Sequence, residues 1–136
     1  IHSVDSERLL AEIEEQAAAL SLTPRVLLEV NCSGEEDKQG FSADDVRRLL
    51  PTLARFAHVR VGGLMTMAAL EGGEATARAS FAALRLLRDE LAAQAPSGVS
   101  LDELSMGMSG DFEAAIAEGA TMVRIGSSLF EGLMSP

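Results

Sequence analysis

The sequence predicts an α/β fold in which parallel strands alternate with helices, and three observations support this. Short apolar runs of strand length recur along the chain, at 26–31, 59–66, 101–104 and 122–125. Between these runs lie longer stretches whose apolar residues repeat every three or four positions, as in an amphipathic helix. The run 26–31 is almost continuously apolar, which is typical of a strand covered on both faces and therefore of a parallel sheet.

The first half of the chain supplies two helices. Residues 1–4 resemble the end of a strand, and Asp5 is the expected N-cap of a helix that follows at once. That helix should bury one apolar stripe: Leu10, Ile13, Ala17 and Leu20. Ser42, with Asp45 three residues later, has the spacing of a capping box for the second helix. The second helix should bury a stripe of its own: Val46, Leu49, Leu50, Leu53 and Phe56.

The second half continues the same alternation. A long helix closed by Pro96 should bury Ala77, Phe81, Leu84, Leu87 and Leu91. A strand is expected at 101–104, then a helix from 111 to 118 ended by Gly119, a strand at 122–125 and a final short helix. No linker interrupts the pattern, so one domain, 1–136, is expected. The alternation fits an open doubly wound sheet or a closed barrel, and these strands would make little more than half of an eight-stranded barrel. The open edges of a half barrel should favour self-association.

Composition limits the classes of function. The formal net charge of -10, from 21 acidic and 11 basic residues, argues against sequence-independent binding of nucleic acid or anionic lipid. The apolar runs are far shorter than a membrane span, and no signal-peptide pattern occurs, so a cytoplasmic location is expected. One cysteine and two histidines do not make a zinc-ligand pattern. Any anionic ligand must therefore be held by a local site.

Two stretches at the ends of the last two predicted strands share one design. Ser105, Gly107 and Ser109 follow one apolar run, Gly126 and Ser127 follow the next, and a helical pattern begins after each. The first amides of a helix have no partner inside it, and glycine lets a ligand approach the backbone. One such loop alone would be explained by turn chemistry. Two consecutive loops predict an anion site, since phosphate commonly lies between the last two strand-to-helix loops of a barrel.

Arg124 is a charged residue within the last apolar run. A buried guanidinium is costly without a partner, so it should face a carboxylate, a ligand or water. Pairing with Asp102 or Glu103 and contact with a ligand both remain open. The alternation of side chains puts Arg124 and Gly126 on the same face of the strand, which is compatible with the ligand role. No catalytic triad, paired-carboxylate spacing or metal motif occurs, so no catalytic residue is predicted.

Two segments, LSMGMSGDF at 104–112 and VRIGSSLF at 123–130, closely resemble the YggS/PROSC family, the pyridoxal phosphate homeostasis proteins. Further family blocks match at 2–6, 30–31, 38–41 and 63–66. The resemblance implies a TIM-type (β/α)8 barrel like the N-terminal domain of alanine racemase, of which this chain would be roughly the second half, lacking the N-terminal strands.

The resemblance also implies pyridoxal 5'-phosphate (PLP) as cofactor and partner. Its phosphate would be held by Ser105, Gly126 and Ser127, and its pyridine nitrogen would lie near Arg124. A cation there makes the ring a poorer electron sink, and family members are regarded as PLP carriers and regulators without established turnover. The Schiff-base lysine of the family lies on the first barrel strand, a segment not in this chain. Lys38 matches a different block and is not expected to take that role.

Two other classes of function remain as alternatives. A racemase-like enzyme of the same barrel group would need a lysine and a tyrosine as its two bases, and this sequence has one lysine and no tyrosine. A phosphate-binding barrel fragment could instead serve only as an assembly partner. The leading prediction is a non-catalytic PLP-binding protein of PLP homeostasis.

Overall fold

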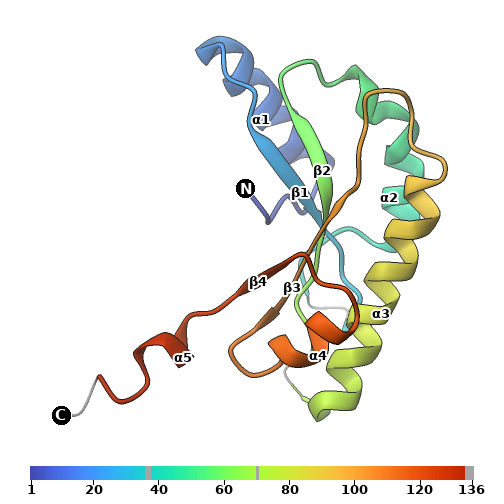
Figure 1. Ribbon diagram of the computed structural model, residues 1–136. Coiled ribbons are helices and arrows are strands. Elements are labelled where there is room, and N and C mark those ends of the chain that lie inside the picture. The colour runs from blue at the N-terminus through green and yellow to red at the C-terminus, as the bar shows by residue number, and fades with distance from the viewer. Residues whose placement is uncertain (36–37, 70, 134–136) are drawn as a thin grey trace.

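The computed structural model describes residues 1–35, 38–69 and 71–133, in which strands and helices alternate (Figure 1). The elements are α1 (Glu7–Leu20), β1 (Arg25–Glu29), α2 (Ala43–Leu49) with a 3-10 turn (Leu50–Arg55), β2 (Arg60–Met65), α3 (Gly73–Ala92), β3 (Glu103–Met108), α4 (Phe112–Ala117), β4 (Met122–Arg124) and α5 (Ser127–Phe130). The predicted α/β class with parallel strands is confirmed. Among the described helices, none combines the length and the apolar character needed to cross a bilayer.

The four strands form one parallel sheet in the order β1-β2-β3-β4. Residues 1–4 run parallel to β1 outside it: Leu27 N donates to Ile1 O at 2.8 Å, and Glu29 N donates to Val4 O at 2.9 Å. The strand end expected at the start of the chain is thus present only as an isolated bridge between Val4 and Leu28. One free edge of the described sheet is formed by this segment and the other by β4.

The register across β1, β2 and β3 produces two neighbouring rows of side chains. Leu28, Leu64 and Leu104 pair in the first row, and the residues that follow them, Glu29, Met65 and Ser105, pair in the second. Successive residues of a strand point to opposite faces, so the two rows lie on opposite sides of the sheet.

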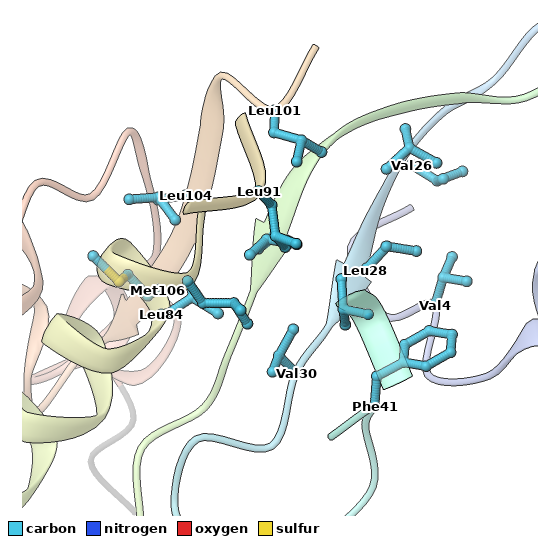
Figure 2. Close-up of a cluster of buried hydrophobic side chains, with 14 of the residues drawn as sticks. Val4, Val26, Leu28, Val30, Phe41, Leu84, Leu91, Leu101, Leu104 and Met106 are labelled. Atoms are coloured by element: carbon cyan, nitrogen blue, oxygen red, sulfur yellow. The ribbon is translucent and has the colours of Figure 1, made fainter. Parts of the chain in front are cut away.

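The apolar row belongs to the hydrophobic core, which the helices complete (Figure 2). Leu28, Leu64 and Leu104 are fully buried, and Figure 2 shows Leu84 and Leu91 of α3 beside the strand residues. The predicted stripe of α3 is confirmed in full: Ala77, Phe81, Leu84, Leu87 and Leu91 are all buried. In Figure 1, α2 and α3 lie on one side of the sheet, and α5 stands apart from the other helices.

The start of α1 differs from the prediction. Ser6, not Asp5, is the N-cap, because the Ser6 hydroxyl accepts from Leu9 N at 3.3 Å. Asp5 instead accepts the hydroxyl proton of Ser6 at 2.9 Å. At the other end, Leu20 is exposed rather than buried, since the helix stops there and Ser21 takes a left-handed conformation. The capping box of Ser42 and Asp45 is present as predicted.

The strand expected at 101–104 is also corrected, because β3 runs from Glu103 to Met108. Pairing with β2 on one side and β4 on the other stabilises residues whose glycine and serine suggested a loop. Gly107 is required inside this strand, since its φ is +93° and an added Cβ would lie 2.5 Å from Ala115 Cβ. Ser105 therefore lies in the middle of a strand and not in a turn.

Candidate functional site

Arg124, at the end of β4, is half-buried and is held by two uncharged acceptors. Its Nη1 donates to Ser105 Oγ at 2.9 Å, and its Nη2 donates to the backbone oxygen of Thr66 at 3.2 Å. Burial lowers the pKa of the Arg124 guanidinium, while the more distant charges of Asp111 and Glu29 oppose that shift. A guanidinium has five N–H donors, so these two bonds leave three for another partner.

The carboxylate partners considered for Arg124 are engaged elsewhere. Glu103 forms an ion pair with Arg25 at 3.0 Å and accepts the hydroxyl of Thr121 at 2.6 Å. The Asp102 carboxylate accepts the hydroxyl proton of Ser100, and the Asp102 backbone oxygen accepts from Arg88. Within the described part of the chain, no carboxylate lies in ion-pair distance of Arg124. Of the two alternatives open from the sequence, the structure disfavours the intramolecular pair.

Ser105 is fully buried and joins Arg124 to a residue that the sequence analysis did not single out. His2 Nδ1 lies 2.9 Å from Ser105 Oγ. Burial lowers the pKa of His2, and the positive charge of Arg124 lowers it further. Side chains two residues apart in a strand point to the same face, so His2 would be expected beside Val4 in the core. The sequence therefore contains no signal that His2 contacts Ser105.

Glu29 of β1 adds a carboxyl group to the second row. In that row, Met65 of β2 lies between Glu29 and Ser105. Only 5% of Glu29 is exposed. Burial raises its pKa, the negative charge of Asp5 raises it further, and the positive charge of Arg124 opposes both. This side of the sheet thus carries an arginine, a histidine, a serine and a carboxyl group, whereas the opposite side is apolar.

The loops that follow β3 and β4 lie against each other. Gly126 N and Ser128 N both donate to Ser109 Oγ, at 3.2 and 3.3 Å. The two amides therefore converge on one oxygen atom. Ser127 is exposed between them, and the space around Gly126 is open, since an added Cβ there would meet no atom within 4 Å. The expected meeting of the two loops is present, and the residue that joins them is Ser109.

The loop after β3 has fewer free backbone N–H groups than expected. Asp111 Oδ1 accepts from Met108 N at 2.6 Å, so an amide at the end of β3 is already satisfied within the chain. The nearby cavity of about 480 Å³ is lined by Met108, Ser109 and Asp111 but by none of Ser105, Arg124, Gly126 or Ser127. The four predicted site residues are thus divided between two groups: Ser105 with Arg124 on the sheet, and Gly126 with Ser127 in the last loop.

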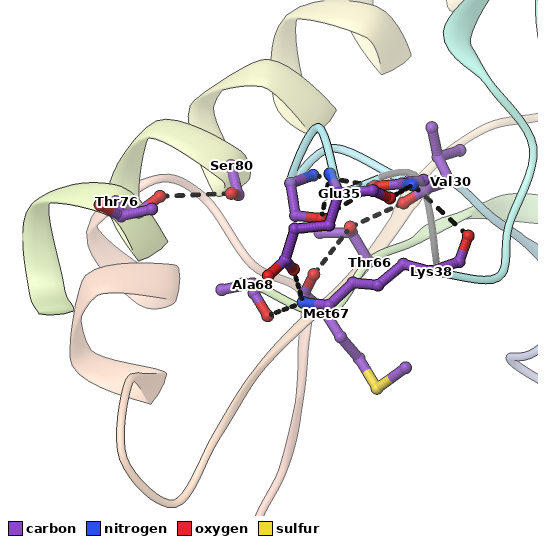
Figure 3. Close-up of polar contacts among 10 residues, drawn as sticks. Val30, Glu35, Lys38, Thr66, Met67, Ala68, Thr76 and Ser80 are labelled. Atoms are coloured by element: carbon purple, nitrogen blue, oxygen red, sulfur yellow. Dashed lines mark hydrogen bonds and ion pairs between the residues drawn. The ribbon is translucent and has the colours of Figure 1, made fainter. Parts of the chain in front are cut away.

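Lys38 is held in the loop after β1 (Figure 3). Its Nζ donates to the backbone oxygen of Ala68 at 2.9 Å and lies 2.5 Å from a carboxylate oxygen of Glu35. Thr66, the residue after β2, donates its hydroxyl proton to the backbone oxygen of Val30, the residue after β1, at 2.7 Å. These contacts give Lys38 a clear structural role.

Comparison with known proteins identifies the family of the chain. Residues 1–133 match the family model described as alanine racemase, N-terminal domain. The chain belongs to this family. It is 45% identical to the pyridoxal phosphate homeostasis protein of Aquifex aeolicus and 41% identical to that of Pseudomonas aeruginosa, over 96% of this chain in each case. The resemblance inferred from the sequence motifs is confirmed. The chain spans about half the length of these relatives, 56% and 54%.

Solved structures of the family agree with the fold. PipY of Synechococcus elongatus, in a structure without PLP, superimposes with a TM-score of 0.90 at 42% identity, covering 96% of this chain and 60% of PipY. The structure of PipY with PLP bound gives a TM-score of 0.85 at 40% identity, covering 96% and 59%. Diaminopimelate decarboxylase of M. jannaschii, at 14% identity and a TM-score of 0.75, shows a likeness of fold alone.

Proposed function

We propose that this chain belongs to a non-catalytic PLP-binding protein of PLP homeostasis and contributes Ser105, Arg124, Gly126 and Ser127 to the cofactor site. Family membership, relatives named pyridoxal phosphate homeostasis proteins and the PLP-bound structure of PipY support the proposal. The observation that carries it in this chain is the convergence of the Gly126 and Ser128 amides on one oxygen. A phosphate oxygen is an acceptor of the kind that such converging amides bind.

The residues present fit the two ends of this cofactor. In the last loop, Ser109 Oγ occupies the position that a phosphate oxygen would take between the two amides. On the sheet, the free N–H groups of Arg124 can donate to the pyridine nitrogen. PLP supplies a reactive aldehyde on an electron-withdrawing ring. A permanently charged donor such as Arg124 keeps the ring nitrogen unprotonated and so weakens that withdrawal, which suits storage better than turnover.

The racemase-like alternative receives no support from the site. Lys38, the lysine of this sequence, is bound to Glu35 and Ala68 and is not placed to act as a base. We further propose that the described strands are the second half of a (β/α)8 barrel organised as one domain, 1–136. The basis is that the proposed phosphate loops follow β3 and β4, as the last two loops do in such barrels.

A titration with PLP tests the proposed site. The wild-type protein should show saturable binding by absorbance, competed by inorganic phosphate. Ser127→Asp places a carboxylate beside the Gly126 and Ser128 amides, so it should raise the dissociation constant at least about tenfold by charge repulsion. Ser97→Asp, at another exposed serine, makes the same charge change away from the site and should leave affinity unchanged. Absence of saturable binding, or equal weakening by both variants, would refute the proposal.

A further inference from the structure

The chain contains two histidines, and their rings face different kinds of partner. His58 Nδ1 lies 3.0 Å from Glu14 Oε1, and an ionised carboxylate can only accept a hydrogen bond. His58 must therefore donate from Nδ1. His2 Nδ1 lies 2.9 Å from Ser105 Oγ, and a hydroxyl can either donate or accept. The role of the His2 ring thus depends on what else Ser105 binds.

The hydrogen bonds of Ser105 determine whether His2 Nδ1 donates or accepts. Arg124 Nη1 lies 2.9 Å from Ser105 Oγ, and a guanidinium can only donate, so the Ser105 oxygen is the acceptor in that bond. The hydroxyl has one proton, and the side chain is fully buried. Within the described part of the chain, His2 Nδ1 is the acceptor available to that proton. A buried hydroxyl proton without an acceptor would be costly, so the proton points to His2.

We propose that His2 is a positioning residue that orients Arg124 through Ser105. The neutral His2 ring carries its proton on Nε2 and accepts from Ser105, while Ser105 accepts from Arg124. The carbonyl of Thr66 holds the other Nη of the same guanidinium at 3.2 Å. Contacts that lead back to His2, to Ser105 of β3 and to Thr66, the residue after β2, thereby fix the plane of a side chain that projects from β4.

A guanidinium fixed in this way recognises a ligand by the direction of its acceptor as well as by charge. Its remaining N–H donors suit one acceptor atom in the plane, such as an aromatic nitrogen. The amides of the last loop belong to a separate group of contacts, so loss of His2 should not affect the binding of a phosphate group there. This consequence for ligand selection rests on the proposed function, whereas the arrangement of the three side chains does not.

The arrangement is tested without ligand by long-range ¹H–¹⁵N correlation spectra of the labelled protein near neutral pH. The two rings should show opposite patterns, with His2 protonated on Nε2 and His58 protonated on Nδ1. His58→Ala assigns the signals. A His2 ring with its proton on Nδ1, or a doubly protonated ring, would overturn the proposal.

A variant series then tests positioning. In His2→Ala, the side-chain N–H signals of Arg124 should exchange faster with water than in the wild type. In His2→Gln, whose amide oxygen can accept from Ser105, slow exchange should return. Because His2 is partly exposed, both variants are expected to fold. Arg124 signals that do not change in His2→Ala, or that are equally altered in both variants, would contradict the positioning role.

Binding measurements separate this proposal from the cofactor site itself. His2→Ala should weaken PLP binding about fivefold, the value of one well-placed hydrogen bond, and leave the dissociation constant of inorganic phosphate unchanged. Equal losses for both ligands would contradict selection by the oriented guanidinium. If the wild-type protein binds no PLP, the proposed function fails, while the spectra still decide the arrangement of His2, Ser105 and Arg124.

Discussion

The two sides of the sheet use adjacent residues of the same strands for different purposes. Leu28, Leu64 and Leu104 form a row that is fully buried against the helices. One residue further along each strand, Glu29 and Ser105 flank Met65 on the other side. The first row stabilises the fold by removing apolar surface from water. The second row contains two polar side chains that are costly to bury, and one of them, Ser105, contacts His2 and Arg124.

This difference between the two sides of the sheet supports the ligand site proposed above. The helix side is filled, and a change there mainly affects stability. On the other side, Arg124 retains unused donors, and its neighbours Ser105 and Thr66 hold it in place. Polar residues that are unfavourable for stability but held in a defined geometry are typical of functional sites.

The largest expected effect comes from the centre of the apolar row. Leu64→Ala should lower the free energy of unfolding by about 2–5 kcal/mol, because Leu64 is fully buried between β1 and β3 and its loss leaves a cavity. Urea denaturation measures the change. Leu86→Ala on α3 removes the same atoms from a side chain that is 60% exposed and should stay within about 0.5 kcal/mol. Similar losses in both variants would mean that the row does not dominate the core.

The apolar side could be predicted from the sequence in detail, because its signal is periodic. Every residue of the α3 stripe is buried as expected, from Ala77 to Leu91. The near-continuous apolar character of 26–31 predicts a strand, and β1 (Arg25–Glu29) overlaps that region. The prediction is wrong where the periodicity ends, as at Leu20, the last residue of α1, whose side chain is exposed.

The polar side could be predicted only in part, because its contacts join segments far apart in the chain. Ser105 and Arg124 were identified by residue type, but Ser105 was expected in a turn, since its pairing with β2 is not visible locally. His2 contacts a residue 103 positions away and does not follow strand alternation. Ser109 resembled an ordinary loop serine until its two amide partners were located.

A smaller effect on stability is expected at Glu29, in the row formed by Glu29, Met65 and Ser105, and this effect should depend on pH. Burial raises the pKa of Glu29 in the folded state, so the native protein binds more protons than the unfolded chain above the usual pKa of glutamate. Stability contributed by this group therefore falls as pH rises through that window. Glu29→Gln removes the penalty and should be more stable than the wild type at pH 7, with the difference vanishing below about pH 4.

The control for this measurement is Glu15→Gln, an exposed carboxyl on α1. It should change the free energy of unfolding by less than about 0.5 kcal/mol at either pH. Urea denaturation at pH 7 and near pH 4 gives both comparisons. A Glu29→Gln variant less stable than the wild type at pH 7 would show that attraction to Arg124 outweighs burial, and that the polar row stabilises the fold.

The smallest effect on stability is expected from an exposed ion pair between helices α2 and α3. Arg47 of α2 forms two hydrogen bonds with Glu90 of α3, both at 2.7 Å, yet both side chains are about 40% exposed. Water and salt screen such a pair, so a double-mutant cycle with Arg47→Ala and Glu90→Ala should give a coupling energy below about 1 kcal/mol, smaller still in 1 M salt. A coupling as large as the loss in Leu64→Ala would mean that ion pairs, and not the apolar row, hold the helices on the sheet.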